Sequence, residues 1–124
     1  PFTLTGTVIK GHQRGRELGF PTANLNLPID QAMPADGVYL TWALINDIRY
    51  RSLSNVGDNP TFGDKERAVE VFIFDFDQDI YGHSMTIEIV SRLREEIRFS
   101  SAQALIDQMY QDVSDAKKTF EQHL

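Results

Sequence analysis

The sequence contains no cysteine and no long apolar run. Without cysteine there can be no disulfide framework, no thiolate zinc site and no cysteine nucleophile. No segment approaches the roughly 20 apolar residues that cross a bilayer, and the N-terminus lacks the pattern of a signal peptide. These absences predict a soluble, cytoplasmic protein that does not act at a membrane.

Basic charge is also scarce, since the 124 residues carry a formal net charge of −6. Binding to nucleic acid usually needs a broad basic surface, so we expect no nucleic-acid partner. Residues 1–27 contain Lys10, Arg14 and Arg16 against Glu17, a net +2, so residues 28–124 carry −8. A small basic segment on an acidic body suits a compact anion such as a nucleotide polyphosphate. A solvated turn with ordinary surface charges is the alternative explanation.

The length allows one domain over residues 1–124 and no second domain. The chain begins with Pro1 rather than Met, which is compatible with an excised or processed piece of a longer protein, and the sequence alone leaves this open.

The basic segment from Gly11 to Asn24 reads GHQRGRELGFPTAN and has three glycines spaced four residues apart. Such glycines disfavour a settled helix or strand and permit positive φ angles. The spacing fits neither GxGxxG nor GxxxxGK[ST], so it supports neither a Rossmann site nor a P-loop. The segment predicts a flexible basic flap that can hold phosphate.

Thr22 and Asn24 close this segment two residues apart. In an extended chain their oxygens point to the same side. Magnesium commonly takes one or two protein oxygens and fills its remaining positions with phosphate oxygens and waters. The pair therefore suits Mg²⁺ bound with a nucleotide, and ordinary turn chemistry is the alternative.

Five segments rich in β-branched and alternating apolar residues predict strands. They are Thr3 to Ile9, Gly37 to Ile45, Ile48 to Val56, Val69 to Phe76 and Ser84 to Val90. Asn46-Asp47 predicts a hairpin turn.

The last segment, Ser100 to Leu124, lacks Gly and Pro and repeats its apolar residues at helical spacing. It predicts a long amphipathic helix with a capping box formed by Ser100 and Gln103. Many strands followed by one helix predict a small antiparallel barrel over about residues 1–99. The helix, over about residues 100–122, would cover an open end of that barrel.

Glu70 is the carboxylate with the most distinctive surroundings. In an extended strand it shares a face with Phe72, Phe74 and Phe76. A carboxylate beside aromatic rings is partly desolvated, which makes it a better proton acceptor for an alcohol. The alternative is that this face is exposed to solvent and that the charge only guards an edge strand.

Arg94 and Phe99 flank Glu95-Glu96 just before the helix. An arginine and an aromatic ring at that place suit a planar ligand, or they pack the start of the helix. The sequence alone leaves both explanations open.

Taken together, these segments closely resemble the riboflavin kinase (flavokinase) module, especially the bacterial form that ends bifunctional riboflavin kinase/FMN adenylyltransferase proteins. The resemblance covers nearly the whole chain and is most specific in GFPTAN. The matching segments are Gly11, Arg14-Gly15-Arg16, Leu18 to Leu25, Gly37-Val38-Tyr39, Asn55-Val56-Gly57 with Pro60-Thr61, Val69-Glu70-Val71, Asp75-Phe76-Asp77, Tyr81-Gly82, Leu93-Arg94 with Glu96, and Leu105 to Lys118.

The resemblance implies a six-stranded antiparallel Greek-key barrel with a long C-terminal helix. It implies transfer of the ATP γ-phosphate to the ribityl 5′-hydroxyl of riboflavin, with Mg²⁺ as cofactor and FMN as product. It also implies that an FMN adenylyltransferase domain can precede such a module.

The resemblance also implies roles for individual residues. Glu70 would be the general base, and Thr22 and Asn24 would coordinate the metal. Arg94 and Phe99 match positions that contact flavin. The positions that match the ATP site are Gly11, Arg14, Gly15, Arg16, Thr22, Ile73 and Tyr81. Two departures are Phe72, where relatives often have His, and Ile97, where they can have Lys.

Two other functions fit the same sequence. One is a barrel that binds flavin or nucleotide without catalysis. The other is an interaction module whose helix docks a partner domain.

Overall fold

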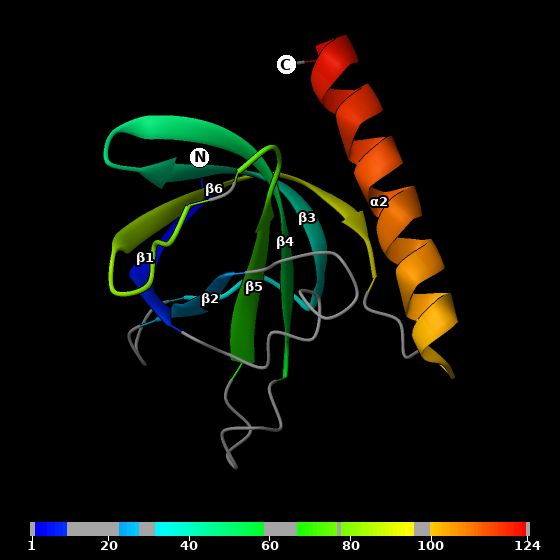
Figure 1. The fold of residues 1–124 in the computed structure, drawn as a ribbon, viewed down its shortest axis with the longest axis horizontal. Coiled ribbons are helices and arrows are strands. Elements are labelled where there is room, and N and C mark those ends of the chain that lie inside the picture. Colours follow the sequence, from blue (N-terminus) through cyan, green and yellow to red (C-terminus); the bar gives the residue numbers. More distant parts are fainter. Residues whose placement is uncertain are drawn as a thin grey trace.

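The computed structural model describes residues 2–9, 23–27, 32–58, 67–76, 78–95 and 100–123. These residues form six strands and one helix (Figure 1). The elements are β1 (Phe2–Ile9), β2 (Ala23–Asn26), β3 (Gly37–Ile45), β4 (Ile48–Asp58), β5 (Arg67–Ile73), β6 (Ser84–Arg94) and α2 (Ala102–His123). All five predicted strands are present, and the short β2 is an addition to them.

The strands close into a barrel in the order β1-β2-β5-β4-β3-β6, with every neighbouring pair antiparallel. Strands β3, β4 and β5 lie side by side in sequence order, and β6 returns to the free side of β3. That arrangement is a Greek key. The predicted fold class is therefore confirmed.

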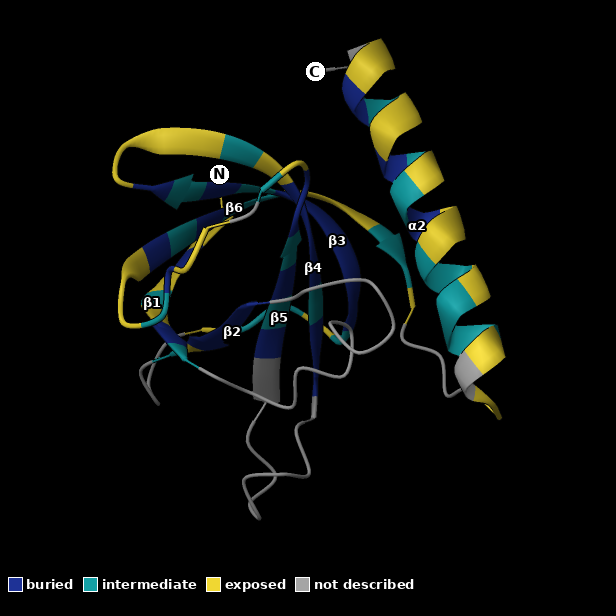
Figure 2. Cartoon of the chain, in the orientation of Figure 1, coloured by how far each residue is buried: buried dark blue, intermediate teal, exposed yellow. Residues whose placement is uncertain are grey.

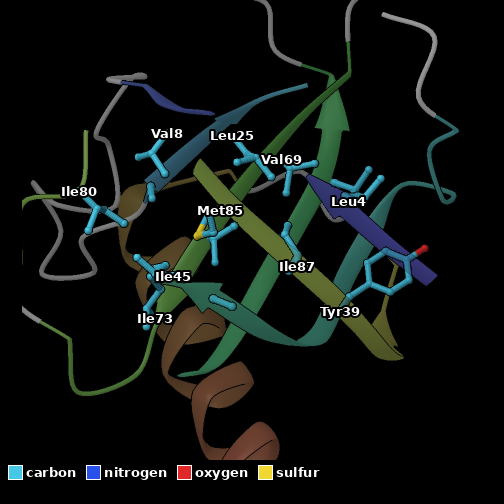
Figure 3. Close-up of a cluster of buried hydrophobic side chains, with 14 residues drawn as sticks. Leu4, Val8, Leu25, Tyr39, Ile45, Val69, Ile73, Ile80, Met85 and Ile87 are labelled. Atoms are coloured by element: carbon cyan, nitrogen blue, oxygen red, sulfur yellow. The ribbon is translucent and has the colours of Figure 1, made fainter. Parts of the chain in front are cut away.

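The barrel is filled by one side of each strand. Figure 3 shows Leu4, Leu25, Val69 and Ile87, from four different strands, pointing into a common interior. The same space holds three hydroxyls, with Thr41 Oγ1 lying 2.7 Å from Ser52 Oγ and 2.9 Å from Ser54 Oγ. These hydroxyls satisfy one another, so they add little penalty to the apolar interior.

The predicted hairpin between β3 and β4 is confirmed, with pairing from Gly37↔Val56 to Ile45↔Ile48. Its two turn residues, Asn46 and Asp47, have φ angles of 51° and 67°. Positive φ at both central residues matches the right-handed twist of the flanking strands.

Helix α2 lies along the outer wall of the barrel and does not cover an open end (Figures 1 and 2). Its buried face packs Ala116 and Phe120 against Leu40 of β3 and Leu53 of β4. Those strand residues are apolar on the outward face, so without the helix they would meet water. The expectation of a helix over the open end was wrong because both faces of β3 and β4 carry apolar residues.

A partly buried ion pair also fixes the helix to the barrel. Arg94, the last residue of β6, donates from Nε and Nη2 to the two carboxylate oxygens of Asp112, both at 2.8 Å. Gln108 donates to the same carboxylate at 2.9 Å. Arg94 Nη1 donates to the carbonyl of Glu95 at 2.8 Å. The pair joins the end of β6 to the middle of α2.

The cap of the helix lies one residue later than predicted, and the helix begins at Ala102. Ser101, not Ser100, caps it, because Ser101 Oγ accepts the N–H of Ala104 at 3.1 Å. Gln103 does not complete a capping box in this structure; its side chain donates to Asp107, one turn further along the helix, at 2.8 Å.

Strand β5 ends earlier than predicted, at Ile73. Phe74 and Asp75 form a turn in which Asp75 has a φ of 53°. Phe74 packs beneath the helix, whereas Phe76 packs against Tyr50 at a ring-centroid distance of 4.9 Å. Glu70 therefore shares its strand face with Phe72 and not with a row of three phenylalanines.

Strand β6, in contrast, extends past the predicted Val90 to Arg94. Its pairing with β3 shifts register twice, between Val38/Tyr39 and Leu40/Thr41.

Among the described residues, no helix has both the length and the apolar composition that crossing a membrane requires.

We predict that Asp112→Ala lowers the free energy of unfolding by about 3 kcal/mol, because it leaves the Arg94 guanidinium without its carboxylate in a partly buried place. Urea unfolding measures this loss. Asp115→Ala is the matched control, because this carboxylate on the same helix accepts only a side-chain bond from Gln111 at 2.9 Å. The control should cost less than about 1 kcal/mol. Equal losses in the two variants would contradict a special role for the Arg94 pair.

Candidate functional site

Glu70 lies in the middle of a row of side chains that crosses three strands. It pairs with Asn24 of β2 on one side and with Asn55 of β4 on the other. Directly paired residues on neighbouring strands point to the same face of a sheet. The register therefore brings Asn24, Glu70 and Asn55 together, although they are far apart in the sequence.

This row lies on the outer face of the barrel. Val69 and Val71, the neighbours of Glu70, are 0% and 1% exposed and belong to the interior core. Since successive side chains of a strand point to opposite faces, Glu70 points outward. Leu25 and Val56 place Asn24 and Asn55 on the outer face by the same argument.

The position of β5 rules out one part of the alternative explanation of Glu70, and its role as a base stays a prediction. At Glu70 the strand is paired on both sides, so Glu70 does not guard a sheet edge. Its side chain is half-buried. A half-buried carboxylate between two asparagines is better placed for proton transfer than a carboxylate that is fully exposed to solvent.

Both asparagines have a buried polar atom without a hydrogen-bond partner. Asn24 is only 4% exposed, and its Nδ2 has no partner; in Asn55 it is Oδ1 that has none. Such atoms are rare in folded proteins and each calls for an explanation. Here they flank one carboxylate on the outer face of the barrel, which makes this row the candidate site.

The row continues beyond Asn55 onto β3 and β6. Asn55 pairs with Val38, and Val38 pairs with Arg94. Arg94 is held by Asp112 of α2, so the packing explanation of this arginine is present in the structure. Its predicted contact with flavin stays a prediction, and the register places it at the far end of the row from Asn24.

Two of the residues expected at the ATP site do not belong to this row. Ile73 is 6% exposed and points into the barrel interior. Tyr81 is half-buried in a turn, and its N–H donates to Asp79 Oδ1 at 3.1 Å. The structure does not bring either residue into the row, and their contacts with ATP stay predictions.

Several predicted site residues lie outside the residues that the structure describes. They are Gly11, Arg14, Gly15, Arg16, Thr22 and Phe99. Ile97, one of the two departures from the family pattern, also lies there. The predictions for the basic flap and for the second metal ligand stay predictions.

The described ranges contain no cluster of three or more His, Asp or Glu residues suited to a metal ion. Asn24 can still contribute to a Mg²⁺ site, because magnesium in nucleotide complexes takes few protein ligands. Its carboxamide is buried and lies beside Glu70, and its Oδ1 is the atom that can coordinate a metal, whereas the unpaired Nδ2 cannot. Those features fit a ligand of a metal that arrives with phosphate.

The row also contains a residue that motif reasoning did not single out. The sequence predicted no role for Asn55, which was noted only as part of a segment that matches the family. An asparagine between the apolar residues Leu53 and Val56 of a predicted strand is a signal that could have found it. Asp112 was missed as well. Its position within the apolar stripe of the helix is the signal that a buried partner exists.

Comparisons with known proteins find relatives over nearly the whole chain. Residues 1–120 match the sequence model of the family described as Flavokinase: Riboflavin kinase. The human protein named riboflavin kinase is 34% identical over 98% of this chain and 82% of its own length. The Bacillus subtilis protein named RNA-binding riboflavin kinase RibR is 42% identical over 95% of this chain.

The fold is shared with a solved relative. The crystal structure of riboflavin kinase from Trypanosoma brucei superposes with a TM-score of 0.74 at 25% identity, covering 98% of this chain and 80% of that one. The chain spans 51% of the length of the Bacillus subtilis relative. The match to the family over nearly all of its residues, and the fold shared with the solved member, show that this chain belongs to the riboflavin kinase family.

Proposed function

We propose that this chain transfers the γ-phosphate of ATP to the ribityl 5′-hydroxyl of riboflavin, giving FMN and ADP. Family membership supports this reaction. The observation that carries the mechanism is the direct pairing of Asn24 with Glu70 on the outer face of the barrel. A candidate metal ligand and a candidate base then lie on neighbouring strands, roughly 5 Å apart.

Glu70 is the general base of the proposed reaction. It accepts the proton of the 5′-hydroxyl as the oxygen forms its bond to the γ-phosphorus. The bond from that phosphorus to the bridging oxygen breaks, and ADP leaves. Phosphoryl transfer of this kind depends mainly on alignment and on stabilisation of charge. The half-buried position of Glu70 keeps its orientation fixed between two paired strands.

Asn24 and Thr22 would hold Mg²⁺, which supplies neutralisation of the charge on the phosphates when it is bound. The buried carboxamide of Asn24 brings no net charge, and this is adequate because the nucleotide carries the negative charge. The basic residues Arg14 and Arg16 would lie over the polyphosphate, and flap closure would exclude water.

Both substrates are water-soluble, so we also propose a cytoplasmic location. An FMN adenylyltransferase domain accompanying this module would use the FMN that the module makes. In that arrangement the two activities would share one chain.

The first prediction separates this proposal from a barrel that only binds flavin. The chain, incubated with riboflavin, ATP and Mg²⁺, should form FMN that chromatography detects. Omitting ATP is the control and should abolish FMN formation. Flavin bound without any FMN formed would favour the non-catalytic function.

The second prediction concerns the base. Glu70→Gln should lower turnover by about 10²-fold or more, because it removes the proton acceptor while keeping the shape. Riboflavin affinity should stay within a few-fold. Steady-state rates and flavin fluorescence titration measure the two effects. Glu88→Gln is the matched control, since Glu88 lies on β6 and contacts Arg49 at 3.4 Å, away from the row. Near-normal turnover in Glu70→Gln would remove Glu70 from this role.

The third prediction concerns the metal. Thr22→Ala or Asn24→Ala should raise the Mg²⁺ concentration that gives half-maximal rate, because each removes one oxygen ligand. Rate measurements over a Mg²⁺ titration test this. Asn26→Ala serves as the control, since Asn26 lies on the same strand and face but is exposed. An unchanged requirement in both ligand variants would place the metal elsewhere.

A further inference from the structure

Asn55 is the third member of the row, and neither the predicted base nor the predicted metal ligands account for it. It pairs directly with Glu70 across β4 and β5. Its Oδ1 is buried and has no hydrogen-bond partner. We propose that this oxygen accepts a hydrogen bond from a secondary hydroxyl of the ribityl chain, so that Asn55 selects the polyol part of the substrate. The proposal rests on the proposed function.

The order of residues in the row supports this assignment. If Glu70 takes the proton of the terminal hydroxyl, then the side chain one strand away, at about 5 Å, meets the hydroxyls that follow along the chain. On the opposite side of Glu70 lies Asn24, where the phosphate and metal would be. Asn55 is therefore on the side from which the rest of the acceptor substrate must approach.

The row changes from polar to apolar side chains after Asn55. After Asn55 comes Val38, an apolar residue that is 4% exposed and packs with the residues beneath α2. The polar part of the row therefore ends at Asn55, and a polyol that runs from Glu70 along the row meets Asn55 as its last polar side chain before this apolar residue.

The free-energy cost of the unpaired Asn55 Oδ1 favours a hydrogen-bond donor that the ligand supplies. A buried acceptor without a partner costs free energy in the unliganded protein. A ligand hydroxyl that donates to it removes that cost, and an analogue without the hydroxyl does not. Sites of this kind reject such analogues strongly. A carboxamide also accepts the bond without adding a second negative charge beside Glu70.

Asn55 has a second conceivable role, which is to orient the Glu70 carboxylate through its N–H group. That role would change turnover but would not make riboflavin binding depend on a particular ribityl hydroxyl. Comparing substrate analogues therefore separates the two roles.

The experiment measures dissociation constants by quenching of flavin fluorescence, in the presence of MgADP, which cannot donate a γ-phosphate. The ligands are riboflavin and three analogues that lack the 2′-, 3′- or 4′-hydroxyl. The native chain should bind at least one analogue about 10-fold or more weakly than riboflavin. Asn55→Leu should bind riboflavin as weakly as that analogue and no longer distinguish them. Asn55→Asp keeps an acceptor oxygen and should keep the discrimination.

Asn26→Leu is the matched control, because it changes the same residue type on the same barrel face at an exposed position; its affinities should equal those of the native chain. Asn55→Ala replaces the leucine variant if the latter does not fold. The proposal is overturned if the native chain does not distinguish the analogues, if Asn55→Leu or its alanine substitute discriminates as the native chain does, or if Asn55→Asp loses discrimination. Binding is measured here without turnover. If the chain formed no FMN, that result would contradict the proposed function and would leave the test of Asn55 unaffected.

Discussion

The register of β5 between β2 and β4 is the constraint on which the site depends. Val69 and Val71 are almost completely buried in the barrel interior, and this fixes the face to which Glu70 points. A slip of one residue would turn Glu70 into the core and both valines out. Such a slip is costly because β5 is paired on both sides in a closed barrel. It would break the hydrogen bonds to both β2 and β4 and would remove the two valines from the core. The same packing that stabilises the fold therefore orients the candidate base.

The outer wall of the barrel is divided between packing and function. Helix α2 lies against the outer wall (Figure 2) and covers the apolar outward residues of β3 and β4, such as Leu40 and Leu53. The polar row runs from Asn24 of β2 through Glu70 of β5 to Asn55 of β4. The Arg94–Asp112 pair fixes the helix at the end of the row. A helix over the barrel opening would have left the apolar wall exposed.

Within the described residues the interior hydroxyls are mutually hydrogen-bonded, whereas two amide atoms beside Glu70 are not. This contrast sets the two asparagines apart from the polar groups of the interior. Local features that lower stability without compensation are expected at functional sites. Asn24 and Asn55 have this property, and they lie on the two sides of the same carboxylate.

Periodicity and short motifs were enough to predict the five longer strands, the Asn46-Asp47 turn and the amphipathic helix, and to recognise the resemblance to a kinase family. The sequence could not determine that β5 ends at Ile73, that Ser101 caps the helix, or that the helix lies on the wall. Those outcomes follow from competition between contacts that are distant in the chain. Only the tertiary structure placed Asn55 beside Glu70 and Arg94 against Asp112. Strand register is a property of closed pairing and core packing together, and no local segment contains that information.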